Sequence, residues 1–281
     1  METASPYRLE RIVANRETLH RDAALLRAVF PHATHYTDDF LAWEYADNPD
    51  GPVVGYDAYR DGELCAHYAT QPLTATLFGR SVRGLLSFNT ATHPDHQGHG
   101  LFTTLARRTF DDAAREGYEF VVGVANQNST PGFTRKLGFQ LVGPLEVFVG
   151  LGAPHSGVGD GVDFARTWST ESRGWRLASP RTRYVLAGGR LACATDTPLI
   201  KALLTAGPWD GPQASTSFLL SHPFSVWMGA APSLSWRGIS LPLPKRLRPS
   251  PLNLIFLDLT GAGRTLDSKR VIFDAIDFDA Y

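Results

Sequence analysis

The chain has few cysteines and no long apolar run, and each absence excludes a class of protein. Its two cysteines, Cys65 and Cys193, are too few for the disulfide framework of a small secreted domain. No apolar run approaches the roughly 18 residues that a membrane-spanning helix needs, and the polar start Met1–Ser5 is unlike a secretory signal peptide. We therefore expect a cytoplasmic protein that does not enter a membrane.

A surplus of charge of either sign is also absent. The 281 residues contain 27 Lys and Arg against 28 Asp and Glu, which gives a formal net charge of −1. Proteins that bind nucleic acids normally carry a basic surplus, so we expect no nucleic-acid partner. Hydrophobic residues make up 43% of the chain. A chain of this length can bury a large core and suggests about two domains.

The most informative segment that is present is a loop with two glycines. The strand-like run Leu85–Thr92 leads into His93–Phe102, and a helical pattern continues to about Arg115. Gly98 and Gly100 let the main chain close around a ligand, because no Cβ blocks the approach. Backbone N–H groups entering the helix point at one spot, which the helix dipole makes favourable for phosphate. The segment therefore predicts a pyrophosphate-binding loop.

The dinucleotide-binding fingerprint Gly-x-Gly-x-x-Gly is the obvious rival interpretation. This chain has Thr103 at the third glycine, and Gly98 lies too far beyond the strand for the tight turn that the fingerprint needs. The fingerprint also needs an acidic residue at the end of the next strand, but Glu119 precedes the next apolar run, Phe120–Val124. We therefore reject a dinucleotide site.

Two segments resemble motifs of one known family. Gln97–Phe102 resembles the Gln/Arg-x-x-Gly-x-Gly/Ala loop that holds the coenzyme A pyrophosphate in the GNAT superfamily of N-acetyltransferases, except that Phe102 stands where Gly or Ala is usual. Asn126–Phe139 resembles the "Asn … Tyr-x-Lys-Leu-Gly-Phe" helix and turn that closes the acyl-CoA site of the same family. Because both motifs occur in the family's order, each beside the expected strand or helix pattern, the chain is identified as a member of this superfamily.

The resemblance implies an α/β (α+β) fold, with a mixed, mostly antiparallel sheet flanked by helices. We expect an acetyl-CoA-binding domain over residues 1–151, a glycine-rich linker over 152–161 and a second, smaller domain over 162–281. Trp43–Pro49 is similar to Trp175–Pro180, and each precedes a strand-turn-strand pattern. The second domain is therefore either a degenerate GNAT-like half without the coenzyme A loop or an accessory domain that shapes the acceptor site. A chance similarity of two short elements stays open.

The family's chemistry is direct attack of an amine on the acyl thioester, which implies acetyl-CoA as co-substrate and no metal. We expect coenzyme A to contact two groups of residues, one in the strand and loop and one in the later turn. These residues are Thr90, Ala91, Thr92, Gln97, Gly98, His99, Gly100, Leu101 and Phe102, followed by Asn126 and Asn128.

The catalytic acid is where the sequence departs from the family. Thr134 stands at the place of the usual tyrosine, and a threonine hydroxyl is a poor acid near neutral pH. Either another group protonates the thiolate, or the thiolate leaves unaided, or the protein is not an acyltransferase. We favour unaided departure, because the pKa of a thiol is only about 8.5.

Candidates for the base and for orienting the amine lie on the central strand, on the second helix and in the later turn. We single out Asn89, Glu44 and Asn128. Asparagine cannot act as a base, but it can orient an amine or a water molecule. His93, placed before Pro94 as in many family members, is an alternative base.

The function predicted from the sequence is acetyl transfer to the amine of a small molecule, such as an amino sugar or a natural-product intermediate, by a monomer or homodimer. The basic run Lys245–Arg248 would suit a phosphate-bearing acceptor if it faced the cleft. Two alternatives stay open: a protein lysine or N-terminal acetyltransferase, and a non-catalytic module that binds coenzyme A.

Overall fold

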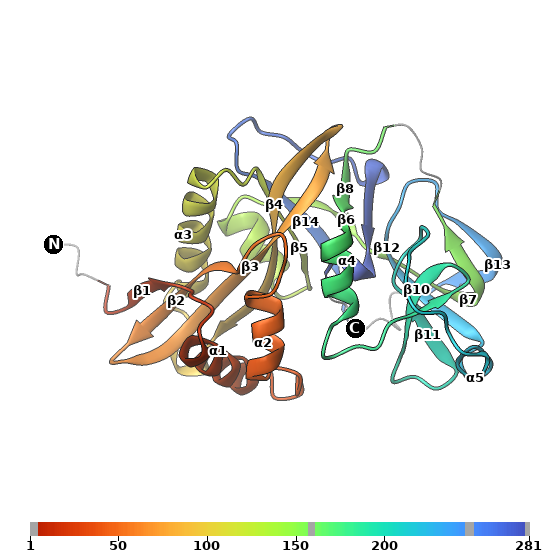
Figure 1. The fold of residues 1–281 in the computed structure, drawn as a ribbon. Coiled ribbons are helices and arrows are strands. Elements are labelled where there is room, and N and C mark those ends of the chain that lie inside the picture. The colour runs from red at the N-terminus through yellow and green to blue at the C-terminus, as the bar shows by residue number, and fades with distance from the viewer. Residues whose placement is uncertain (1–4, 157–160, 245–249, 279–281) are drawn as a thin grey trace.

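A computed structural model of the chain describes residues 5–156, 161–244 and 250–278. One 15-stranded, mostly antiparallel sheet runs through the protein with helices packed on it (Figure 1), which confirms the expected fold class. The first half contains β1 (Arg8–Arg11), α1 (Arg16–Val29), α2 (Asp38–Tyr45), β2 (Val54–Arg60), β3 (Glu63–Leu77), β4 (Arg80–Thr92), α3 (Leu101–Arg115), β5 (Phe120–Ala125), β6 (Gln140–Pro144) and β7 (Glu146–His155). The second half contains β8 (Phe164–Thr167), α4 (Thr170–Leu177), β9 (Val185–Ala187), β10 (Arg190–Ala194), β11 (Ile200–Leu203), α5 (Thr216–Ser221), β12 (Phe224–Ala230), β13 (Ser235–Pro242), β14 (Asn253–Asp258) and β15 (Val271–Asp274).

Helices cover both faces of the sheet in the first half. Tyr68 of β3 lies in the core beneath α3, while its neighbour Ala69 lies in the core beneath α1 and α2. Successive strand residues point to opposite faces, so the two cores lie on opposite sides of the sheet. The start of α2 is fixed as its sequence predicts, because the Thr37 hydroxyl accepts a hydrogen bond from the N–H of Phe40 at 3.1 Å.

The parallel strands β4 and β5 pair over only part of their length. Leu85–Ser87 of β4 is in register with Val121–Gly123 of β5, whereas β4 continues to Thr92 and β5 to Ala125. Beyond Ser87 no further pairing joins these two strands in the described structure. The edge of β4 that faces β5 is therefore open in front of the glycine loop.

The two halves exchange one strand each. β14, from the second half, pairs with both β5 and β6 of the first half. β7, from the first half, pairs with both β12 and β13 of the second half. In Figure 1 the blue strand β14 accordingly lies among the strands of the first half, and the green strand β7 lies with those of the second.

This exchange corrects the boundaries expected from the sequence. The predicted linker over 152–161 is wrong at its start, because Gly152–His155 complete β7; residues 157–160 lie outside the described residues. Cutting the chain near residue 156 would not separate two independent units, because β7 pairs with β12 of the second half and β14 pairs with β5 of the first. The apolar pattern over 140–150, which reads as one strand, is divided into β6 and β7 because the chain crosses between the halves there.

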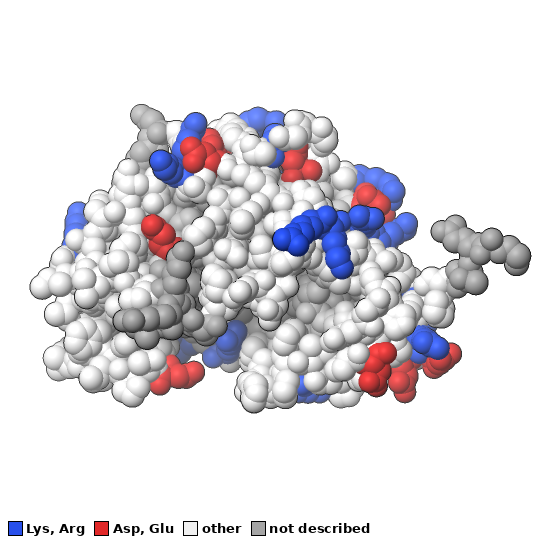
Figure 2. Space-filling view, turned by 180° about the vertical axis from the view of Figure 1, so that it is seen from behind, with Lys and Arg blue, Asp and Glu red and all other residues white. Residues whose placement is uncertain are grey.

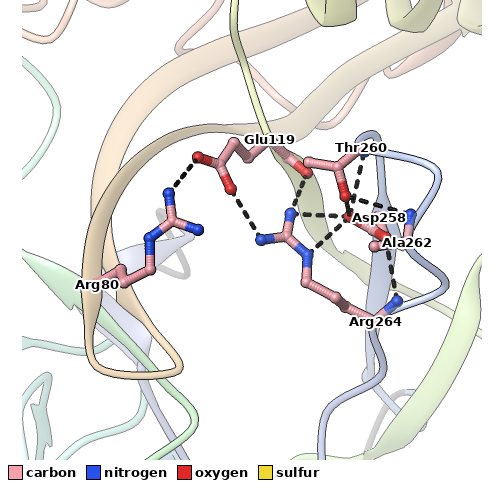
Figure 3. Close-up of polar contacts among 6 residues, drawn as sticks. All are labelled: Arg80, Glu119, Asp258, Thr260, Ala262 and Arg264. Atoms are coloured by element: carbon pink, nitrogen blue, oxygen red, sulfur yellow. Dashed lines mark hydrogen bonds and ion pairs between the residues drawn. The ribbon is translucent and has the colours of Figure 1, made fainter.

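A network of charged residues fixes the end of β14 against β5 (Figure 3). The guanidinium of Arg264 donates to Asp258 at the end of β14 and, at 2.8 Å, to the carboxylate of Glu119 beside β5. Arg80 lies on the other side of Glu119, at 3.4 Å. Burial alone would raise the pKa of Asp258, but hydrogen bonds from Arg264 and Thr260 lower it to about 2. The exchanged strand is thus held by charge as well as by pairing.

Trp43 and Trp175, which the sequence comparison paired, meet where the halves touch. Their rings stack with centroids 4.7 Å apart. The indole N–H of Trp43 donates to the carbonyl of Trp175 at 3.0 Å, and that of Trp175 donates to the carbonyl of Trp43 at 2.9 Å. Such reciprocal contacts are those of two elements related by a local two-fold axis.

The strand connections of the two halves also correspond. β2, β3 and β4 form an antiparallel meander with β5 parallel to β4. β9, β10 and β11 form a second meander with β12 parallel to β11. The intervening helices differ, since α3 has 15 residues and α5 has 6. No Gln-x-x-Gly-x-Gly loop precedes α5.

Charges of both signs occur on the rear face of the protein, where several basic side chains lie together (Figure 2). Among the described residues, none of the helices combines the length and the apolar character needed to cross a membrane.

Candidate active site

The open edge of β4 contains a β-bulge at Asn89. In the register with β3, Phe88 faces Ala69 and Thr90 faces Tyr68, so Asn89 is an extra residue without a partner strand position. Its φ of +36° lies in the left-handed region, which asparagine tolerates better than most other residues with a side chain. The bulge turns this side chain out of the strand's regular alternation.

Three side chains hold Asn89. Its amide nitrogen donates to the carboxylate of Glu44 at 2.6 Å and to the hydroxyl of Tyr45 at 3.2 Å. Its amide oxygen accepts from the hydroxyl of Tyr36 at 3.1 Å. Both amide hydrogens and the carbonyl oxygen therefore have partners, which fixes the amide in one orientation.

A cavity of about 320 Å³ opens beside this bulge. Polar side chains from both halves line it: His35, Tyr36, Glu44, Gln71, Ser87 and Asn89 from the first half and Arg176, Arg181 and Asp277 from the second. Ser87 and Val124 line it where β4 and β5 part. The cavity therefore lies at the divergence of the two strands, and the second half supplies part of its wall.

Two of the predicted catalytic residues, Glu44 and Asn89, meet in this cavity. Glu44 comes from α2 and is only 4% exposed, so its carboxylate is largely withdrawn from bulk water. The short hydrogen bond from Asn89 orients this carboxylate. A carboxylate held beside a cavity is suited to take a proton from an amine that binds there.

The glycine loop has the backbone of an anion site. Gly98 and Gly100 have φ values of +80° and +74°, and a Cβ on either would meet no atom within 4 Å. The first intrahelical bond of α3 runs from the N–H of Thr104 to the carbonyl of Gly100, so the N–H groups of the first helical turn, from Leu101 on, lack an acceptor within the helix. Open space, free donors and the helix dipole together fit a pyrophosphate.

Phe102, the departure from the family loop, points into the core. Its ring contacts Phe133 edge-on, with centroids 5.1 Å apart, and lies 6.0 Å from the ring of Tyr68. A Cβ on Gly132 would lie 3.1 Å from Phe102. The bulky residue is therefore accommodated by a glycine in the helical turn Gly132–Lys136, and the open side of the loop stays clear.

The strand residues expected to contact coenzyme A lie between the loop and the bulge. Thr90, Ala91 and Thr92 pair with β3 on one side only, so their other edge faces the opening toward β5. Gln97 links the loop to this strand through a 3.5 Å contact from its side-chain amide to the carbonyl of Thr92. His99 is exposed in the loop, and its Nδ1 contacts the carbonyl of Gln97 at 3.0 Å.

Asn126 and Asn128 lie in the exposed turn after β5. The side-chain oxygen of Asn126 accepts from the N–H groups of Asn128 and Ser129, both at 2.9 Å, which is the geometry of an Asx turn. Neither asparagine is among the residues that line the 320 Å³ cavity. The structure thus brings Asn89 and Glu44 together but leaves Asn128 apart from them.

Thr134 is committed to its own helical turn, because its hydroxyl donates to the carbonyl of Thr130 at 2.9 Å. We expect Thr134→Val to retain acyl-transfer turnover within a few-fold of the wild-type rate. Steady-state kinetics of thiol release provides the measurement. A loss of about a hundredfold, the scale of a positioned proton donor, would show that Thr134 protonates the leaving thiolate.

Other candidates from the sequence lie outside the cavity. The Nδ1 of His93 accepts from the N–H of Asp95 at 3.4 Å in the turn before the loop, and His93 is not among the cavity's lining residues. Residues 245–248, considered for a phosphate-bearing acceptor, lie outside the described residues.

The sequence analysis did not identify Tyr36, Arg176 and Asp277 as residues of the site. The only available signal was the similarity around Trp175, which stands next to Arg176.

Comparisons with known proteins agree with the fold. Residues 12–142 match the family described as "Acetyltransferase (GNAT) domain". A probable N-acyltransferase from Enterococcus faecalis V583 has a TM-score of 0.59 at 10% identity, over 90% of this chain and 73% of its own. GCN5-related N-acetyltransferases are also similar, from Kribbella flavida (TM-score 0.56, 12% identity, 89% and 70% coverage) and Anabaena variabilis ATCC 29413 (0.54, 11%, 90% and 73%). At these identities the structures show the fold, and they do so across both halves. A search of curated proteins found no match.

Proposed function

Because this chain is a GNAT-family acyltransferase, with acetyl-CoA as its acyl donor, we propose that it acetylates the amine of a small molecule bound in the cavity beside Asn89. The observation that carries this proposal is the pair formed by Glu44 and Asn89. These residues lie 2.6 Å apart, at the bulge and at the point where β4 and β5 diverge.

The proposed site runs from the glycine loop along the end of β4 to the cavity beside Asn89. The backbone of Gly98–Phe102 binds the pyrophosphate, and the open edge of Thr90–Thr92 pairs with the pantetheine arm. Acetyl-CoA supplies the thioester. A strand rises about 3.3 Å per residue, so the distance along β4 from Thr92 to Asn89 is about 10 Å. An arm that follows this edge therefore ends beside the cavity.

The proposed mechanism assigns proton transfer to Glu44. Its carboxylate, oriented by Asn89, takes a proton from the ammonium group of the acceptor, and the neutral amine attacks the thioester carbonyl. The N–H groups along the open edge of β4 are placed to stabilise the oxyanion. The thiolate leaves unaided, because the hydroxyl of Thr134 is already donated to the backbone.

A small acceptor is favoured by the cavity's walls. Arg176, Arg181 and Asp277 reach it from the second half, whereas a peptide substrate needs an open groove. We infer that the second half is a degenerate GNAT-like copy that covers the acceptor site. The reciprocal contacts of Trp43 and Trp175 and the matching strand connections support a duplication. The short α5 and the missing loop support loss of coenzyme A binding.

Acetyl transfer to a panel of amines tests this proposal. The panel contains amino sugars, amino acids, polyamines and lysine-bearing peptides, and thiol release from acetyl-CoA is measured for each. We expect at least one small amine to exceed the peptides in kcat/KM by about tenfold or more. A peptide as the best acceptor would contradict the small-molecule proposal. Binding of acetyl-CoA without turnover on any amine would support a non-catalytic module.

A further inference from the structure

A series of buried hydrogen bonds leads from Asn89 into the interior of the first half. The hydroxyl of Tyr45, which accepts from Asn89, lies 2.8 Å from Nε2 of His67. Nδ1 of the same imidazole lies 2.7 Å from the carboxylate of Asp57. Tyr45 and His67 are 0% exposed and Asp57 is 1% exposed, so water does not compete for these contacts.

The direction of each bond follows from the chemistry of the groups. A carboxylate only accepts, so Nδ1 of His67 donates to Asp57, and Nε2 of the neutral ring is then an acceptor. Tyr45 donates its hydroxyl hydrogen to Nε2 and accepts from the amide of Asn89. Every donor in the series has one acceptor, which makes this arrangement self-consistent in a buried site.

Other charged and titratable groups surround His67. Asp22 of α1 is 0% exposed, and its carboxylate lies 3.8 Å from Nδ1 of His67. Tyr59 donates to the second oxygen of Asp57 at 3.3 Å, and the guanidinium of Arg21 lies 5.5 Å from the ring centre of Tyr59. On the cavity side, Glu44 precedes Tyr45 in α2.

We propose that His67 is a positioning residue for acyl transfer: it holds the hydroxyl of Tyr45, which holds the amide of Asn89 in the orientation that donates to Glu44. This inference rests on the proposed function of the Glu44–Asn89 pair. It explains why a histidine and two carboxylates are buried directly behind the bulge. If apolar side chains filled this space instead, the hydroxyl of Tyr45 would have no buried partner to fix its orientation. The second amide hydrogen of Asn89 would then lack an ordered acceptor.

A metal site is the alternative use of these side chains. The ligand atoms of Asp22, Asp57 and His67 lie within 4.8 Å of one another. However, the 2.7 Å contact between His67 and Asp57 is a hydrogen bond, which needs a proton on Nδ1 where a metal needs the lone pair. The geometry therefore favours the positioning role.

The positioning role carries a pH dependence. Burial raises the pKa of Asp22 to about 7, against the attraction of His67. Burial would lower the pKa of His67, but the charges of Asp22 and Asp57 outweigh it and raise that pKa. As the pH falls through about 7, Asp22 takes up a proton, and His67 takes up its second ring proton at a higher pH than an ordinary imidazole does. Once Nε2 is protonated it donates to Tyr45, and the hydroxyl hydrogen of Tyr45 must turn away from His67.

Tyr45→Phe tests the proposal, because it removes one hydroxyl and keeps the ring. With the best small amine of the panel as acceptor, we expect kcat to fall about tenfold, with KM for acetyl-CoA unchanged. We also expect the wild-type kcat to fall in a step as the pH is lowered and His67 takes up its second ring proton, and we expect Tyr45→Phe to abolish this step. Tyr56→Phe is the matched control, since its buried hydroxyl donates to Asp112, away from the cavity, and its profile should equal that of the wild type.

A second variant and a metal analysis complete the test. His67→Gln should reproduce the loss of the pH step, and circular dichroism checks that both variants are folded. If neither Tyr45→Phe nor His67→Gln folds, the wild-type pH profile of kcat decides: a profile without the step overturns the proposal. An active wild type with unchanged Tyr45→Phe kinetics and pH profile overturns it too. So does a stoichiometric metal in the purified wild type that Asp22→Asn loses. A wild type inactive on every amine is a failure of the proposed function itself.

Discussion

Glu44→Gln should lower kcat for acyl transfer by about 10²- to 10⁴-fold, the usual contribution of a positioned general base. The amide keeps the size of the side chain and can still accept the hydrogen bond from Asn89, but it cannot take a proton from the acceptor amine. KM for acetyl-CoA should change by less than a few-fold, because the pyrophosphate loop is remote from the cavity. Steady-state kinetics with the best amine of the panel measures both constants.

Asp39→Asn is the matched control for this variant. Asp39 lies on the same helix, α2, but is exposed and does not line the cavity. Its substitution removes one carboxylate from α2 and should leave kcat unchanged. A Glu44→Gln enzyme that retains more than about a tenth of wild-type kcat would remove Glu44 from the role of base.

A chain that ends at Gly161 should not fold, because it lacks β14. That strand pairs with both β5 and β6, and its Leu254, Ile255 and Phe256 are 1%, 0% and 1% exposed. Without it, two strands gain open edges and two cores lose their filling. We expect insoluble protein from residues 1–161 alone, and a soluble complex when residues 162–281 are co-expressed as a second chain.

Loss of solubility does not show that β14 is the missing element responsible, because the fragment lacks the whole second half. Substitutions of two isoleucines, one on β14 and one on β13, provide the quantitative test. Ile255→Ala on β14 should cost about 2–5 kcal/mol of unfolding free energy, as for other buried large-to-small substitutions. Ile239→Ala on β13, where the side chain is 73% exposed, should change it by less than about 0.5 kcal/mol. Urea denaturation measures both. Equal effects, or a soluble and folded 1–161 fragment, would contradict the strand exchange.

The sequence predicts the backbone conformation of the glycine loop well because the signals there are local. A strand, two glycines with positive φ and an amphipathic helix follow one another within Leu85–Arg115, and each is set by neighbouring residues. Gly138, directly after the helical turn and Leu137, has a φ of +76°, the conformation in which glycine commonly ends a helix. The association of Glu44 with Asn89 is also recoverable, but only through the family resemblance, since no local pattern joins α2 to β4.

The sequence does not predict which strands pair with one another. The pattern over Leu252–Leu259 predicts a strand, but which edge it joins depends on the free edges of β5 and β6, more than 100 positions earlier in the chain. The same holds for Arg176 and Asp277, whose place in the cavity depends on how the second half packs. No sequence pattern relates Asp22, Asp57 and His67, which belong to one helix and two strands. Only the fold brings them together.

We expect one acyl-CoA site per chain, at the glycine loop of the first half, and calorimetric titration with acetyl-CoA measures the number of sites directly. The wild type should bind acetyl-CoA with a stoichiometry of one, and Gly100→Glu should not bind it, because this substitution places a carboxylate in the anion site. Gly79→Glu, at a turn with φ +76° and an equally open Cβ position, should bind as the wild type does. A stoichiometry of two, or undiminished binding by Gly100→Glu, would contradict a single acyl-CoA site at this loop.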